Sequence, residues 1–419
     1  MTAQIPTEPH GLGVLPFPEG LLLQETERPE VAAYNDWVLD PSTADAAHVR
    51  AGLPAAQQPL VDIVAWTAGL TDALPAEPRP ETAPEVAALA WAARAAQALD
   101  AGRAAEAVAL LDRAADRAPA PLAAVLQGEA AGLRQDHGLG TAEEVGAALA
   151  GAEQALAGTD LAETRAGLLH RLGNLAHTRA ATGAEDARTE LQAAMRHYYA
   201  ALQLVTEQSA PLLWAGLQLD LATAHLASPM TTASDQLRLG VATQALRASR
   251  RVFAEHGETG RWAVATVDLA NALVYTPSTH QGDNLVEAVE LYEEVLESGA
   301  RDEDPLGRAR LLANQGNTLA HLGAFAAARA KLAEARYLFE AELDHDGVLA
   351  VREVLDEIAR AEVLAASEPE DGDLARQAEQ MARVPQPEGY TSGMGVQVLP
   401  PPKPTVTVLP TRARTETPR

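Results

Sequence analysis

Apolar residues recur at three- and four-residue spacing along most of the chain, and the same arrangement returns several times. In "LVEAVELYEEVLES", Ala288, Leu291, Tyr292 and Val295 fall on one side of a helix. Comparable segments are "LQAAMRHYYAALQL", "LGVATQALRASRRVF" and "AAARAKLAEARYLF". A second apolar-periodic segment precedes each of them. The pattern therefore predicts repeated pairs of amphipathic helices.

A short motif sets the register of these pairs. It reads "LGN", "LAT", "LAN" and "QGN", and its copies start at Leu172, Leu221, Leu269 and Gln315, with spacings of 49, 48 and 46 residues. Trp214 and Trp262 each lie seven residues before their motif, which supports the same register. One helical pair cannot bury its apolar side alone, so the repeats predict a stacked array.

Proline marks the limits of this array. Of 27 prolines, 12 fall in residues 1–84 and nine in 367–419, which leaves six for the residues between. Because proline breaks helices, residues 85–366 are predicted to form the helical body. Residues 1–84 are expected to be a proline-rich segment with short docked helices at Pro29–Leu39 and Gln57–Leu74. Residues 367–419, acidic and then proline-rich, are expected to be flexible or to act as a docking peptide.

Composition narrows the function classes. A net charge of −26 disfavours nucleic acid and anionic lipid as partners. The absence of cysteine excludes disulfides, thiolate metal sites and a cysteine nucleophile. No apolar stretch is long enough to cross a membrane, and the first residues lack a basic region typical of a secretory signal. A cytoplasmic location is therefore expected. No phosphate-binding loop and no hydrolase or metalloprotease motif is present, so we expect neither an enzyme nor a cofactor.

The helical pair at Gly307–Glu342 carries a family resemblance. Its Gly316, Gly323, Ala328, Leu332 and Ala335 match the small and bulky positions of the tetratricopeptide repeat, and Trp91, Gly102, Ala107, Leu111, Ala114 and Pro119 match them in an earlier pair. The chain thus resembles a tetratricopeptide repeat protein. This resemblance implies an all-α, right-handed superhelical solenoid of about six hairpins over Pro84–Leu343, closed by a helix at Val348–Ala361.

The middle repeats depart from the family. The units that open at Leu172, Leu221 and Leu269 exceed its 34-residue period by roughly a dozen residues. Longer helices and protruding loops both remain open as explanations. Gly173 and Gly316 are expected to let the two helices of a hairpin approach closely.

The resemblance also indicates a binding surface. Asn174, Asn271 and Asn317, with Thr223 in the fourth unit, occupy the position that faces the peptide groove in the family. Asparagine amides there would hydrogen-bond an extended peptide; the alternative is that they satisfy a neighbouring helix locally. Side chains expected to add charge to the same groove are Arg171, His170 and Arg310.

Two weaker signals point to metals. His170 and His177 lie seven residues apart on one predicted helix, but no third ligand stands at helical spacing. Asp344, Asp346 and Glu353 lie at positions of a calcium-binding loop, although glutamate at its first position, Glu342, fits such a loop poorly. The alternative for both sets is an ordinary structural role, and no metal is expected.

The sequence therefore predicts a non-enzymatic scaffold or adaptor that binds an extended peptide or a partner helix in the groove. One alternative is a self-assembling structural protein whose tail contacts neighbouring subunits, so a homo-oligomer is possible. Another is an enzyme with a site in the loops around Thr231–Asp235 and His280–Asp283.

Overall fold

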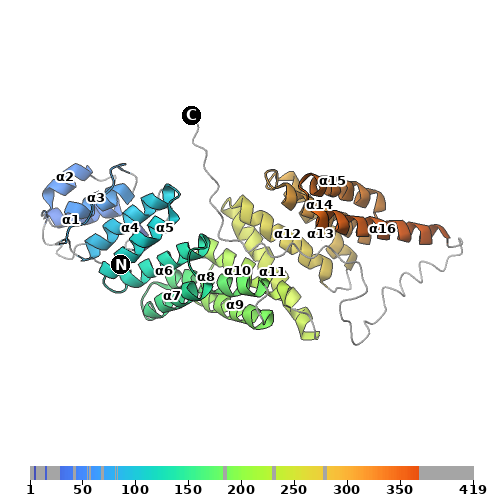
Figure 1. The fold of residues 1–419 in the computed structure, drawn as a ribbon, viewed down its shortest axis with the longest axis horizontal. Helices are drawn as coiled ribbons and strands as arrows, with labels where there is room; N and C mark the ends of the chain where they lie inside the picture. Colours follow the sequence, from blue (N-terminus) through green and yellow to red (C-terminus); the bar gives the residue numbers. More distant parts are fainter. Residues whose placement is uncertain are drawn as a thin grey trace. The chain divides into compact units, whose positions relative to one another are not determined.

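The computed structural model of the chain is built from α-helices. It describes residues 4–5, 15–16 and 29–367, with gaps at 41–43, 54, 56–57, 68–69, 81, 83, 183–185, 229–232 and 277–280. The described residues form 16 helices and one two-stranded antiparallel pair, β1 (Gln4–Ile5) with β2 (Leu15–Pro16). The chain divides into two compact units, Met1–Asp220 and Leu221–Arg419, with the boundary inside one helix. Figure 1 shows the helices in chain order.

The first unit begins with three short helices and continues as hairpins. From α4 to α9, each helix packs against the next in sequence. The helices are α1 (Pro29–Leu39), α2 (Ala46–Gly52), α3 (Gln58–Thr67), α4 (Pro84–Asp100), α5 (Ala104–Arg117), α6 (Leu122–Asp136), α7 (Ala142–Ala155), α8 (Ala162–Ala181), α9 (Ala187–Leu202) and α10 (Pro211–Ala227), whose second part belongs to the second unit.

Helices α1 and α3 lie within the two docked helices that the sequence predicts. Tyr34 and Trp37 of α1 have no exposed surface and share one core with α4 and α5. The sequence missed α2, a seven-residue helix whose start is capped by the Asp45 carboxylate, which accepts a hydrogen bond from the Ala47 backbone N–H. Residues 70–74 form no helix, so the docked helix predicted over Gln57–Leu74 is shorter than expected and appears as α3.

The second unit continues the same order of packing through to its last helix. Its helices are the end of α10, then α11 (Ala233–Glu255), α12 (Thr259–Tyr275), α13 (Gln281–Glu297), α14 (Pro305–His321), α15 (Phe325–Ala341) and α16 (His345–Ser367). The helices of the six predicted hairpins and the closing helix are thus all present. The two helices pack on each other in five of these hairpins: α4/α5, α6/α7, α8/α9, α12/α13 and α14/α15. The predicted tail from residue 368 onward lies outside the described residues.

Longer helices account for only part of the extra length of the middle repeats. Helix α8 has 20 residues and α11 has 23, whereas α5 and α7 have 14 each. Helices α12 and α13 have 17 residues each, as α14 and α15 do, so the extra length of the α12/α13 unit lies in its connections. Five residues separate the two helices in the hairpins α8/α9, α10/α11 and α12/α13, against three in α14/α15. Both explanations that the sequence left open therefore contribute.

Small residues set the distance between the two helices of a hairpin, as predicted. A Cβ atom on Gly173 of α8 would lie 2.3 Å from the Tyr198 ring of α9. A Cβ on Gly316 of α14 would lie 2.8 Å from Leu332 of α15 and 3.2 Å from the backbone oxygen of Ala328. Both contacts are too short for any side chain, so these helices can pack at their observed distance only around glycine.

The second helix of each hairpin carries a matching set of buried residues. A small residue is followed four positions later by a bulky one and seven positions later by another small or medium one. The sets are Ala107/Leu111/Ala114, Val145/Leu149/Ala152, Ala194/Tyr198/Ala201, Ala242/Leu246/Ser249, Ala288/Tyr292/Val295 and Ala328/Leu332/Ala335, all with at most 3% exposure.

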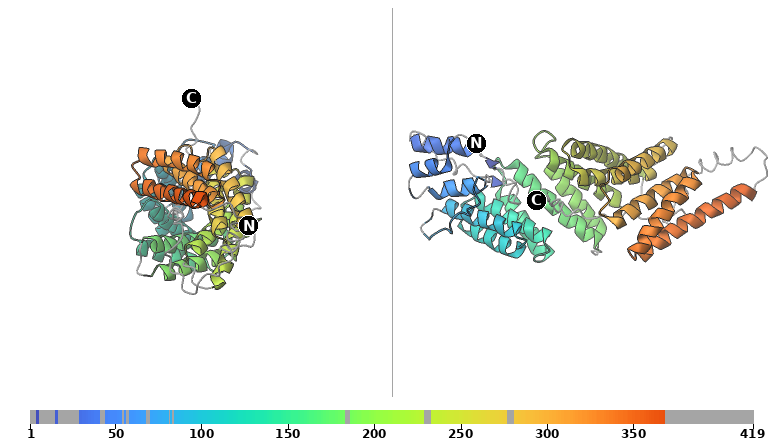
Figure 2. Two further views of the ribbon diagram at one scale, coloured as in Figure 1. Left: turned by 90° about the vertical axis from the view of Figure 1, so that its right-hand side faces the viewer. Right: turned by 90° about the horizontal axis from the view of Figure 1, so that it is seen from above.

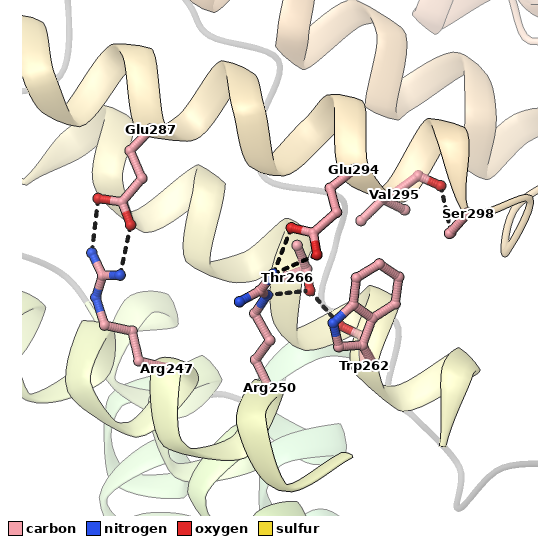
Figure 3. Close-up of polar contacts among 8 residues, drawn as sticks. All are labelled: Arg247, Arg250, Trp262, Thr266, Glu287, Glu294, Val295 and Ser298. Carbon is pink, nitrogen blue, oxygen red and sulfur yellow. Dashed lines mark hydrogen bonds and ion pairs between the residues drawn. The ribbon is translucent and has the colours of Figure 1, made fainter. Parts of the chain in front are cut away.

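Ion pairs connect second helices of neighbouring hairpins in the second unit. Arg247 of α11 lies 2.6 Å from Glu287 of α13, and Arg250 lies 2.5 Å from Glu294, as Figure 3 shows. The Arg250 guanidinium also donates to the Thr266 hydroxyl of α12 at 3.1 Å and stacks over the Trp262 ring. Arg250 therefore holds three successive helices together.

The close approach at Gly173 gives a direct stability prediction. Gly173→Ala should destabilise the chain by about 1–3 kcal/mol, because its methyl group collides with the buried Tyr198 ring. Gly167→Ala is the matched control on the same helix, since nothing lies within 4 Å of a Cβ there. The control should be neutral or stabilising by up to ~1 kcal/mol. Urea denaturation of both variants measures the difference, and equal stabilities would contradict the proposed packing.

Candidate functional site

The first helix of each later hairpin presents one stripe of residues, which we call the first-helix stripe. Its members are spaced by four, three and four residues, so they share one side of their helix. They are Gly167, Arg171, Asn174 and Thr178 on α8; Gly216, Asp220, Thr223 and Ala227 on α10; Val264, Asp268, Asn271 and Tyr275 on α12; and Arg310, Asn314, Asn317 and His321 on α14. Six of the seven predicted groove residues belong to it, and His170 lies next to it.

Two of the three asparagines are buried. Asn271 is 7% exposed, and its Oδ1 accepts hydrogen bonds from the Tyr292 hydroxyl at 2.7 Å and from the Asn314 amide at 3.1 Å. Asn317 is 1% exposed. Neither side chain can reach a bound peptide in this arrangement. The local alternative, in which the amide satisfies a neighbouring helix, describes Asn271.

Asn174 is the member of the predicted ladder that stays accessible. It is only partly buried, and its Oδ1 accepts a hydrogen bond from the Tyr198 hydroxyl at 2.8 Å. Burial raises the pKa of Tyr198 well above its usual value, so the phenol stays protonated as a donor. With the oxygen occupied, the Asn174 amide is oriented and its N–H groups remain for another acceptor.

The tyrosine partners were missed by the sequence analysis. Tyr198 and Tyr292 stand at the bulky position of the second helix, where α15 has Leu332, and each donates to the asparagine of its own hairpin. The sequence does contain a signal for this hydrogen bond, because tyrosine replaces leucine in two of the hairpins whose first helix carries asparagine. A buried phenol needs a hydrogen-bond partner, and the asparagine of the same hairpin supplies one.

The charged groove residues serve contacts between first helices. The Arg171 guanidinium pairs with both Asp136 carboxylate oxygens, at 2.8 and 3.1 Å, and donates to the Gly132 backbone oxygen on α6. Arg310 is more exposed, at 3.9 Å from Asp344. Thr223 is partly buried. Arg171 therefore fixes α8 on α6, while Arg310 remains accessible to a partner.

His170 forms a buried pair with the next first helix. Its Nε2 lies 2.5 Å from Asp220 Oδ2 of α10, and its ring meets the Tyr198 ring edge-on. Burial lowers the pKa of His177, which favours its neutral form inside the protein. Among the described residues, no group of three or more His, Asp or Glu side chains could hold a metal ion. His170 thus contacts Asp220 and Tyr198, and His177 is buried.

The calcium-like segment does not form a loop. Asp344 caps α16, and its carboxylate accepts a hydrogen bond from the Gly347 backbone N–H at 2.9 Å. Asp346 and Glu353 lie within α16 itself. A calcium-binding loop needs about 12 non-helical residues with ligands turned inward, and helix α16 occupies most of that span.

Comparisons with known proteins show no family for this chain. No model of a known protein family matches the sequence, and no curated protein matches it. A solved structure similar to this chain is that of a Rap protein complexed with competence and sporulation factor. It is 13% identical, its match covers 81% of this chain and 95% of the Rap chain, and the TM-score is 0.40. A likeness this distant shows no shared function or ligand.

The structure itself defines the class: an all-α protein whose helical hairpins pack in sequence within each unit. The tetratricopeptide resemblance remains a prediction within that class. No helix in the described part of the chain is both long and apolar enough to span a bilayer.

The buried hydrogen bond between Asn271 and Tyr292 gives a prediction about stability. Asn271→Ala should destabilise the chain by about 1–3 kcal/mol, because it leaves the buried Tyr292 hydroxyl without its acceptor. In the background of Tyr292→Phe, the same substitution should cost less. A double-mutant cycle by denaturant unfolding measures the coupling. Additive effects of the two substitutions would contradict the bond.

Proposed function

We propose that this protein is a non-enzymatic, cytoplasmic interaction scaffold that binds a peptide or a helix of a partner protein on its first-helix stripe. The proposal is narrower than the sequence-based hypothesis, because Asn271 and Asn317 are withdrawn from the binding surface. Within the first unit, the contact then centres on α8 and the adjoining part of α10.

The observation that carries this proposal is the bare surface at Gly167. This glycine is partly exposed, nothing lies within 4 Å of a Cβ built on it, and it is in line with Arg171 and Asn174 on α8. Gly216 stands at the same stripe position on α10. At Gly216 a Cβ would meet the His170 ring at 3.4 Å, so it is Gly167 that leaves its helix backbone open to close approach by another chain. The oriented Asn174 amide lies two turns further along the same side.

Charge favours one class of partner. The chain carries a net charge of −26, so a neutral or basic segment approaches more readily than an acidic one. On α8, Arg171 is already neutralised by Asp136. Recognition there would therefore rest on the shape of the glycine surface and on hydrogen bonds to backbone groups, rather than on an arginine clamp.

The test is to block the glycine surface without disturbing the fold. Gly167→Trp should reduce partner binding by more than about tenfold, because the indole covers the surface that the partner needs. The full-length wild type and variant are used to capture partners from the native cell, and the affinity for each captured protein is then measured by calorimetry.

Gly151→Trp is the matched control. Gly151 lies within α7, is exposed, and also has nothing within 4 Å of a Cβ. The control variant should bind as the wild type does, and circular dichroism should show equal helicity for all three proteins. Partner binding that survives Gly167→Trp unchanged would count against the first-helix stripe as the contact surface.

A further inference from the structure

The last described helix, α16, leaves one side uncovered. Val351, Val354 and Ile358 are at most 2% exposed and form the side that packs on α15 and α14. Leu349 and Val363 are 56% and 68% exposed. At 100° per residue, these two fall on the opposite side of the helix, about 21 Å apart along its axis. Figures 1 and 2 show α16 as the outermost helix at this end of the second unit.

The residues between Leu349 and Val363 on this uncovered side are charged. They are Arg352, Glu353, Asp356 and Arg360, and all four are exposed. The nearest acidic oxygen to Arg360, on Glu357, is 3.9 Å from its guanidinium. Arg360 is thus held only loosely by its own helix. From its first residue to its last, the uncovered side carries an apolar, a basic, two acidic, a basic and an apolar residue.

This order is self-complementary about Asp356. In an antiparallel pair of α16 helices centred on Asp356, Leu349 of one copy lies level with Val363 of the other, since both are seven residues from the centre. Glu353, three residues before the centre, lies nearly level with Arg360, four residues after it, and on the same flank. A two-fold axis repeats both contacts, as an isologous interface requires.

We propose that a second copy of this chain covers the free side of α16, as an antiparallel homodimer with two Leu349–Val363 contacts and two Glu353–Arg360 ion pairs. This inference does not depend on the proposed function, because the first-helix stripe takes no part in the contact. It also differs from assembly through the tail, since every contacting residue belongs to α16.

The same geometry predicts that the dimer is weak. The two Asp356 carboxylates meet at the axis, and each copy carries a net charge of −26. One helix per partner also buries less surface than a standard stable interface of about 800 Å² per partner. Association should therefore be reversible and should need high protein concentration and enough salt to screen the overall repulsion.

A charge exchange tests the arrangement on the full chain by sedimentation velocity over a range of concentrations. Glu353→Arg and Arg360→Glu should each weaken the dimer by about tenfold or more, because each brings two like-charged pairs together. The double variant should restore the wild-type dissociation constant. Asp356→Asn should tighten the dimer, because it removes the repulsion at the axis.

The apolar contact has its own control. Leu349→Asp should abolish the dimer, whereas Leu237→Asp should not, although Leu237 of α11 is 74% exposed. All substituted residues are exposed, so helicity should be unchanged. A chain that stays monomeric at every concentration, a double variant that fails to recover, or equal loss with Leu237→Asp would each overturn the proposal.

Discussion

The structure depends on how closely the two helices of each hairpin approach. Where Gly173 meets the Tyr198 ring and Gly316 meets Leu332, there is no space for even one additional carbon atom. The small residues on the facing helix, Ala194 and Ala328, have no exposed surface. With so few aromatic residues, the core cannot be filled by large rings, so stability has to come from many short-range contacts between closely placed helices. The many alanines of the sequence supply the small side chains that such a core needs.

Close packing of the hairpins has a second effect, because it buries polar side chains. Because Tyr198 and Tyr292 occupy the buried bulky position of the second helix, their hydroxyl groups need acceptors inside the protein. The asparagine of the first helix supplies the acceptor in both cases, at 2.8 and 2.7 Å. Between neighbouring first helices, the Arg171–Asp136 and His170–Asp220 pairs play a comparable part within the first unit. A hydrogen-bonded polar contact is directional, so it favours one register between helices that apolar contacts alone would leave free to shift.

The sequence predicted the hairpins well because their signal is local. Helical periodicity, proline positions and the repeated motif are all read within a single repeat, and they gave the six hairpins, the closing helix and the docked helix at Pro29–Leu39. Helix α2 was missed because seven residues are too few to show a period. Asn271 and Asn317 were assigned to an accessible groove because the motif fixes which helix side they occupy, but not how deeply that side is buried. Burial depends on the neighbouring hairpin, and in particular on Asn314, which comes 43 residues after Asn271.

Two helices of the middle hairpins, α8 and α11, are longer than the others, and their length affects what can bind along them. Helix α8, with its 20 residues, extends over about 30 Å, and α11 is longer still. An extended peptide is only about 5 Å wide between its hydrogen-bonding edges, so a peptide lying across α8 would cover a small part of the helix length. An α-helix of about 10 Å diameter would cover more of this length, and a folded domain would cover all of it. Under the proposed function, the length of α8 therefore favours a partner helix over an extended peptide.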